Sequence, residues 1–371
     1  MPKNLVKSQI TNDKTTRKHR RICPIWPHSP AYNETPAPQW PGDYELNMRD
    51  ELSDVDGPLK GPGLDGWMED PSDVYLPEGE VHSLGDKHSC MFSRRSDTLL
   101  VSFEVAQASA PTSEMPQSTI RAIAEAKDWS HLAVVSLGTT WFRDQDAFAL
   151  FDYLTDTGLF DDFDQILFYG SGSCGYAAAV FSVAAPGATV LAIQPQATLD
   201  PRLCGWDTRF RDARRISFTD RYGFAPDMLD AAAQAFVLYD PSEKPDAIHA
   251  AMMARQNVTL LRMPNMGETL EQSLQQMSIL EPLLELAATG ELTASAFHRL
   301  YRARRNNIDY LLRLLARLNR ENRHYLKYLL CRDTIARMPR RRRVKRFRRQ
   351  MARLKTAMEN REVLLPYSAT R

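Results

Sequence analysis

The sequence predicts an α/β protein: a mostly parallel β-sheet flanked by helices, followed by a C-terminal helical extension. Two observations carry this prediction. Six short apolar runs without clear alternation lie between residues 99 and 263, as is typical of strands buried on both faces. Stretches with helical character separate these runs, and regular strand-helix alternation favours a parallel sheet.

Each apolar run has the length of a strand rather than of a helix, and each is rich in Val, Leu, Ile or Phe. The predicted strands are, in chain order, 99–105, 132–137, 166–169, 189–193, 235–239 and 258–263. The predicted helices between them are 144–156, 174–185, 228–233 and 246–255.

No strand pattern remains after residue 290. Apolar residues recur instead at the spacing of helices in three stretches, 296–318, 324–335 and 344–358. The sequence therefore predicts a C-terminal extension of three or four helices.

Residues 1–95 are expected to form a flexible arm. Clustered prolines are followed by an acidic stretch, from residue 43 to 86, that is rich in Gly and Pro. Few segments there could bury enough apolar surface to offset the entropy lost on ordering. We therefore expect three parts: an arm at 1–95, an α/β core at 96–290 and a basic helical extension at 291–371.

Composition excludes several classes of protein. No run of about 18 apolar residues is present among the 371, and the basic N-terminus lacks the apolar stretch of a secretory signal. The five cysteines form no Cys-x-x-Cys pair, which argues against a zinc module and against a disulfide framework. We expect a cytoplasmic protein without a metal or other cofactor.

The net charge of +1 hides a strong asymmetry. Residues 291–371 contain 23 Lys and Arg against 6 Asp and Glu, a net charge of +17, so the rest of the chain carries −16. Eight of the basic residues lie in the run 340–349. The run is most simply a solvated helix face, and the alternative is contact with a polyanion such as nucleic acid, anionic lipid or a phosphorylated glycan carrier.

The densest signal lies at residues 166–181, where a strand runs directly into small residues and then into an Ala-rich helix. Ser171-Gly-Ser-Cys-Gly175 places a small residue two positions before and two positions after Ser173. This is the spacing of a nucleophile elbow, in which a serine hydroxyl projects from a sharp strand-to-helix turn. The amide of Cys174, at the helix N-terminus, would then face a developing oxyanion.

Two other interpretations of this loop stay open. The glycines could simply let the helix pack closely on the sheet. The loop could also hold a phosphate on its amides, since Gly170-Ser-Gly-Ser-Cys-Gly175 satisfies Gly-x-Gly-x-x-Gly. No Gly-Lys-Ser/Thr follows, however, and no acidic residue ends the next strand at the position of a dinucleotide site.

Four segments give the chain a family resemblance. They are Leu-Gly-Thr-Thr-Trp-Phe at 137–142, the loop at 169–178, Gln-Pro-Gln-Ala-Thr-Leu-Asp-Pro at 194–201 with Trp206 and Arg209 beyond it, and Leu-Arg-Met-Pro-Asn-Met-Gly-Glu at 261–268. Between about residues 99 and 275 the chain resembles the α/β-hydrolase superfamily. More narrowly, it resembles bacterial α/β-hydrolase-like proteins associated with surface-glycan biosynthesis, whose elbow reads Tyr-Gly-Ser-Ser-x-Gly-Gly-Tyr-Ala-Ala.

The resemblance implies a site made of a serine, an acid and a histidine in that order. Ser173 matches the nucleophile and Asp240, after the fifth predicted strand, matches the acid. Glu268 stands where the histidine is expected. The oxyanion amides would come from Cys174 and from the loop at Gly138 or Thr139.

His249 is the next candidate for a base, although a helix-packing role suits its position nine residues after Asp240 better. The sequence leaves three functions open. The first is a serine-dependent hydrolase or acyl transferase acting on a small molecule or a glycan-linked ester, with activity in question because a serine needs a base. The second is a non-catalytic relative that binds a ligand. The third, and weakest, is a phosphate or nucleotide binder of the adenylyl-sulfate reductase type.

Overall fold

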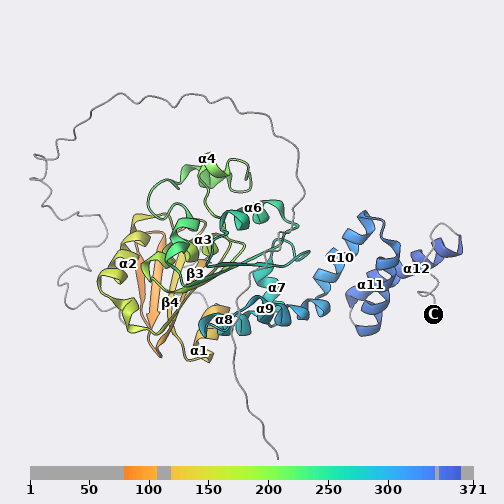
Figure 1. Cartoon of the computed structure of the whole chain (residues 1–371), viewed down its shortest axis with the longest axis horizontal. Coiled ribbons are helices and arrows are strands. Elements are labelled where there is room, and N and C mark those ends of the chain that lie inside the picture. The colour runs from red at the N-terminus through yellow and green to blue at the C-terminus, as the bar shows by residue number, and fades with distance from the viewer. Residues whose placement is uncertain (1–78, 107–117, 339–341, 361–371) are drawn as a thin grey trace, which may run out of the picture. The chain divides into compact units, whose positions relative to one another are not determined.

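The computed structural model describes residues 79–106, 118–338 and 342–360 of the chain. Its centre is an eight-stranded sheet with the strand order β1-β2-β4-β3-β5-β6-β7-β8 (Figure 1). The pairs β1–β2 and β2–β4 are antiparallel, and all other neighbouring strands are parallel. The predicted fold class, a mostly parallel sheet flanked by helices with a C-terminal helical extension, is confirmed.

The strands and helices follow one another in the alternating order that builds a parallel sheet. The strands are β1 (Val81–Leu84), β2 (His88–Ser93), β3 (Thr98–Ala106), β4 (Ser130–Leu137), β5 (Gln165–Ser171), β6 (Thr189–Ile193), β7 (Gln234–Tyr239) and β8 (Val258–Arg262). The α-helices are α1 (Thr119–Ala126), α2 (Gln145–Asp156), α3 (Ser173–Phe181), α4 (Pro201–Cys204), α5 (Ala225–Met228), α6 (Lys244–Met252), α7 (Leu270–Gln276), α8 (Leu280–Ala288), α9 (Ala294–Leu300), α10 (Ile308–Arg320), α11 (His324–Arg337) and α12 (Lys345–Glu359).

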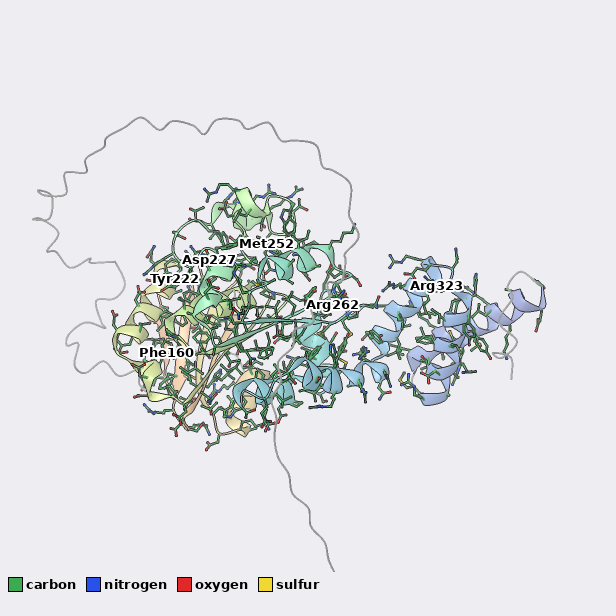
Figure 2. All side chains as sticks on the ribbon, viewed as in Figure 1. Phe160, Tyr222, Asp227, Met252, Arg262 and Arg323 are labelled. Carbon is green, nitrogen blue, oxygen red and sulfur yellow. The ribbon has the colours of Figure 1, made fainter. Side chains whose placement is uncertain are left out.

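The helices cover both faces of the sheet (Figure 1), and the side chains between the sheet and the helices (Figure 2) belong to two separate apolar clusters. Helices α2, α3, α5 and α6 pack on one face, where Phe103, Phe151 and Phe181 stack on one another. Helices α1, α7, α8 and α9 pack on the other face. Because side chains of successive strand residues point to opposite faces, strands covered on both sides become apolar throughout, which explains the continuous runs in the sequence.

The six predicted strands correspond to β3–β8, with ends that differ by no more than two residues. Two further strands, β1 and β2, lie before residue 96, inside the range expected for the arm, and β2 pairs with β4 in full register from His88 to Ser93. The sheet therefore starts before the expected core boundary. Residues 1–78, the remainder of the expected arm, lie outside the described residues.

The C-terminal extension is helical as predicted. Helices α10, α11 and α12 share a small apolar cluster of their own that includes Leu311, Cys331 and Phe347. Among the described helices, none combines the length and apolar character needed to cross a membrane.

Candidate functional site

The turn between β5 and α3 is where the sequence predicts a nucleophile elbow with Ser173 at its centre. Gly172 is its strained residue, with φ 61° and ψ −122°, and it directly precedes the helix. Ser173 is the first residue of α3 and is half-buried. In an elbow the nucleophile occupies the sharp strand-to-helix turn, so the backbone fits Gly172 in the nucleophile position better than Ser173. We call this assignment the frame centred on Gly172.

The space around the glycines supports the same frame. A Cβ atom at Gly170 would lie 2.1 Å from the carbonyl oxygen of Cys174, so only glycine fits two residues before the strained position. A Cβ atom at Gly172 would meet nothing within 4 Å. A side chain at position 172 would therefore project freely from the turn, as a nucleophile does, and the chain has no side chain there.

Asp240 lies at the expected acid position, directly after β7, and is fully buried. Its carboxylate accepts hydrogen bonds from three backbone amides: Ser242 (2.8 Å), Asn265 (3.1 Å) and Gly267 (2.7 Å). Two of these amides belong to the loop after β8, in which the resemblance places the histidine. Asp240 therefore holds this loop through its backbone.

Glu268 lies in the same loop but is exposed. Its neighbour Gly267 is covered by a basic side chain of the extension, because a Cβ atom there would lie 3.0 Å from Nε of Arg313 on α10. Arg317, one turn further along α10, donates from Nη1 to Oδ1 of Asn265 at 3.1 Å. Arginines of α10 thus lie on the loop that would carry a catalytic histidine.

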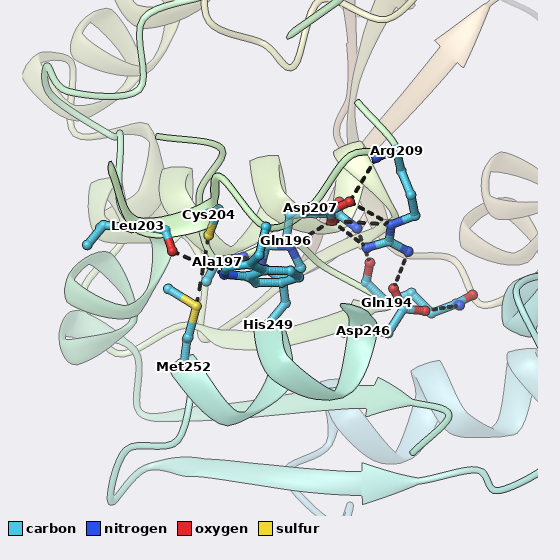
Figure 3. A network of polar contacts seen from close by, with 11 residues as sticks. Gln194, Gln196, Ala197, Leu203, Cys204, Asp207, Arg209, Asp246, His249 and Met252 are labelled. Atoms are coloured by element: carbon cyan, nitrogen blue, oxygen red, sulfur yellow. Dashed lines mark hydrogen bonds and ion pairs between the residues drawn. The ribbon is translucent and has the colours of Figure 1, made fainter. Parts of the chain in front are cut away.

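His249, on α6, is fully buried and uses both ring nitrogens (Figure 3). The amide of Ala197 can only donate, so Nδ1 accepts from it at 3.2 Å, and Nε2 then donates to Oδ2 of Asp207 at 3.1 Å. Burial lowers the pKa of His249, which keeps the ring neutral. The residue joins helix α6 to the segment after β6, in agreement with a packing role.

His249 belongs to a larger network of otherwise buried side chains whose centre is the partly exposed Arg209 (Figure 3). The guanidinium binds Asp207 through Nε and Nη2 and Asp246 through Nη1, the last at 2.6 Å. Gln194 completes the network: it donates to Asp246 at 2.7 Å and accepts from the amide of Leu270. Burial acts to raise the pKa of Asp207, but the bonds from Arg209 prevail and lower it.

The two predicted oxyanion residues lie in different places. Cys174 is the second residue of α3, beside the elbow, and burial raises the pKa of its thiol. Thr139 follows β4, which β3 separates from β5. Two strand spacings amount to about 10 Å, so the topology does not bring Thr139 next to the elbow. The elbow's neighbour is β3, and the residues that follow it, 107–117, lie outside the described residues.

A cavity of about 330 Å³ opens at this edge of the sheet, beside the elbow, and was not anticipated from the sequence. Its polar lining includes Glu104 at the end of β3, Tyr169 and Ser171 at the end of β5, and Glu271 on α7. Glu104 accepts from Ser118 Oγ at 2.8 Å, and Glu271 accepts from the Tyr169 hydroxyl at 2.7 Å.

The electrostatics of this cavity are negative. Burial, together with the charge of Glu271, raises the pKa of Glu104. The same two causes raise the pKa of Tyr169 well above its ordinary value. Within the described ranges, no group of three or more His, Cys, Asp or Glu side chains is arranged to hold a metal ion.

No protein-family model and no curated protein matches the sequence. Solved structures do match. The Gap123 glycosylation-associated protein complex from Streptococcus agalactiae shares 10% identity over 56% of this chain and 46% of that chain, with a TM-score of 0.40. This chain thus spans about half the length of that protein.

Two further matches cover almost the whole of the other protein. Capsule O-acetyltransferase of Neisseria meningitidis serogroup A shares 10% identity over 53% of this chain and 92% of that chain (TM-score 0.35). Est1E from Butyrivibrio proteoclasticus, whose structure is also known with ferulic acid, shares 13% identity over 56% and 97% (TM-score 0.35). The chain is thus similar in structure, at low identity, to esterases and O-acetyltransferases. The strand order and the β5–α3 turn make its fold α/β-hydrolase-like.

Proposed function

We propose that this chain is a non-catalytic α/β-hydrolase-like protein that binds a small-molecule or glycan ligand at the carboxyl edge of its sheet. Gly172 carries the proposal. The strained residue of the elbow, from which a nucleophile would project into open space, has no side chain. An esterase of this architecture needs a nucleophile there.

The rest of the site supports the same conclusion. Asp240 is engaged by three backbone amides, and the loop from 264 to 269 contains no histidine. His249 cannot serve as a base because both its nitrogens are bonded inside the Arg209 network. A serine hydroxyl at position 173 would therefore lack a partner to accept its proton.

Labelling with a fluorophosphonate serine probe tests the proposal. We expect no labelling of the wild type above the level of Ser173→Ala, and no hydrolysis of p-nitrophenyl acetate beyond that same variant. Labelling that Ser173→Ala abolishes would establish Ser173 as a nucleophile and overturn the proposal.

Gly172→Ser and the double variant Gly172→Ser with Glu268→His complete the series. A serine at 172 must adopt the sparsely populated φ and ψ of Gly172, which costs about 1–3 kcal/mol, but it meets no steric clash, so both variants should fold. We expect the probe to label the double variant more than the wild type, because position 172 projects into the space that a nucleophile uses and the histidine introduced at 268 supplies the missing base. Equal labelling of the double variant and the wild type would contradict the frame centred on Gly172.

A second candidate function is polyanion binding by α12. Val344 and Phe347 are buried in the C-terminal cluster, while Lys345, Arg346 and Arg349 are exposed. The apolar side of the helix thus packs mainly on α11 and leaves basic side chains at the surface. Such a face would bind heparin or anionic lipid through charge alone.

Heparin chromatography of full-length protein tests this role. The triple variant Lys345→Glu, Arg346→Glu and Arg349→Glu should elute at a clearly lower salt concentration than the wild type. The matched control reverses three exposed arginines elsewhere, Arg211, Arg214 and Arg215 of the 3-10 helix η3 (Arg211–Arg215). Equal shifts in the two triple variants would show that net charge, not α12, governs binding.

A further inference from the structure

The cavity beside the elbow contains two carboxylates that the protein leaves without a basic partner. Glu104 comes from β3 and Glu271 from α7, so two separate segments bring them to one cavity. Within the described part of the chain, none of the residues that line this cavity is basic. Each carboxylate instead receives a neutral hydroxyl.

These hydroxyls donate to one oxygen of each carboxylate and leave the other oxygen without a hydrogen bond from any described residue. Ser118 and Ser102 both donate to Oε1 of Glu104, at 2.8 and 3.4 Å. Tyr169 donates to Oε1 of Glu271 at 2.7 Å. Oε2 of Glu104 and Oε2 of Glu271 have no hydrogen-bond partner among the described residues. The cavity lining thus contains two carboxylates, each with one oxygen that accepts no hydrogen bond within the described ranges.

Such an arrangement costs stability unless a positive group enters. Taking a carboxylate out of water is unfavourable, and a second carboxylate nearby adds repulsion. A metal ion would require more ligands than the two glutamates supply, and no suitable group of three lies within the described ranges. An ammonium group, which carries three N–H donors and one positive charge, can bridge two carboxylate oxygens.

We propose that this cavity binds a primary ammonium group carried by a small hydroxyl-rich molecule, with Glu104 and Glu271 as its counter-charges. The inference rests on the proposed non-catalytic binding function and names the ligand class for it. The cavity volume of about 330 Å³ is at the lower end of the range for small-molecule sites. Ser171 and Gln275, which also line the cavity, offer polar groups for the hydroxyls of the ligand.

Isothermal titration of the full-length chain with D-glucosamine, D-galactosamine and ethanolamine, and with D-glucose as the uncharged counterpart, tests the site. We expect at least one amine to bind, and glucose to bind at least about tenfold more weakly than glucosamine. Glu104→Gln and Glu271→Gln keep the shape of each side chain and should each weaken amine binding at least about tenfold. Their thermal unfolding, measured alongside, should match or exceed that of the wild type, because a like-charge repulsion has been removed.

Glu268→Gln is the matched control, since it neutralises an exposed carboxylate at the loop after β8 and should leave amine binding unchanged. Loss of binding in this control alone would move the ligand to that loop and overturn the cavity proposal. Equal affinity for glucose and glucosamine would show recognition of hydroxyls without charge and would overturn it too, as would no binding by any amine below about 10 mM. None of these outcomes decides whether Ser173 is catalytic, because probe labelling measures that separately.

Discussion

Two pairs of carboxylates lie at different places in this protein, and only one of the two pairs has a basic partner among the described residues. Asp207 and Asp246 share the guanidinium of Arg209, and His249 joins them as a neutral ring (Figure 3). Glu104 and Glu271 share a cavity that has no basic residue in its described lining. We call the first pair closed, because an arginine of the protein binds both carboxylates. We call the second pair open, because no described residue of the lining is basic.

The difference separates a structural role from a binding role. A buried carboxylate is tolerated when a positive group and further hydrogen bonds compensate its lost hydration. The Arg209 network meets this condition and ties the segment after β6 to β6 and α6. The cavity meets it only in part, through hydroxyls, so the missing positive charge is left for a ligand.

The largest expected effect tests the closed pair. Arg209→Met removes the one guanidinium between two buried carboxylates, whose side chains are 0% and 2% exposed. The Arg209 side chain itself is 32% exposed, so we expect the free energy of unfolding to fall by about 2 kcal/mol, less than for a fully buried ion pair. Urea unfolding followed by circular dichroism measures it.

Arg202→Met is the control for this measurement. Arg202 also binds an aspartate two residues before it, Asp200, but its side chain is 75% exposed. The loss should stay within about 1 kcal/mol. Similar losses for Arg209→Met and Arg202→Met would mean that the network does not depend on its buried charges, and the comparison would fail.

The sequence predicted the strands of the core well because strands covered on both faces are apolar throughout. It missed β1 and β2 because they carry polar residues such as His88 and Ser89, which are buried only once β2 pairs with β4. Register with a distant strand is not visible in local pattern. The start of the sheet could therefore not be located from the sequence alone.

The frame of the elbow could have been obtained from the sequence. Aligned without a gap, Tyr-Gly-Ser-Ser-x-Gly-Gly-Tyr places its second serine on Gly172, between Tyr169 and Tyr176. The spacing of small residues around Ser173 obscured this. The cavity could not have been predicted, because it depends on Glu104 and Glu271, which are 167 positions apart and meet only through packing of α7 on the sheet.

A smaller effect concerns how the closed pair responds to pH. The folded state lowers the pKa of His249, mainly through burial, so this ring resists protonation while the unfolded chain takes up a proton near pH 6.5. The unfolded state then binds more protons, so stability is lost as pH falls below about 6.5, by up to about 1.4 kcal/mol per pH unit. His249→Leu should lose about 2 kcal/mol at pH 8, where Asp207 and the amide of Ala197 lose their partner.

The same variant should also have a flatter stability profile than the wild type between pH 5 and 7, because the titrating group is gone. Urea unfolding across this range measures both effects. The interpretation fails if the wild type and His249→Leu differ by a constant amount at every pH.

The smallest effect, and the one with the opposite sign, belongs to the open pair. Burial and the charge of Glu271 raise the pKa of Glu104 above its ordinary value near 4.5. Above that pH the folded state holds the proton more tightly than the unfolded chain does, so stability is lost as pH rises through the pKa of the folded state. Glu104→Gln cannot titrate, so its stability relative to the wild type should increase with pH above 4.5 and then level off. The difference should be well below that for Arg209→Met, because the carboxylate is only partly buried.

Glu271→Gln should lower the pKa of Glu104, which carboxyl-detected NMR can follow directly, and should weaken this pH dependence. An amine that binds the cavity should act as Glu271→Gln does and lower the pKa of Glu104, since a positive charge favours the ionised form. If the pKa of Glu104 is the same in the wild type and in Glu271→Gln, the two carboxylates do not interact electrostatically. The contrast between an open and a closed pair is then lost.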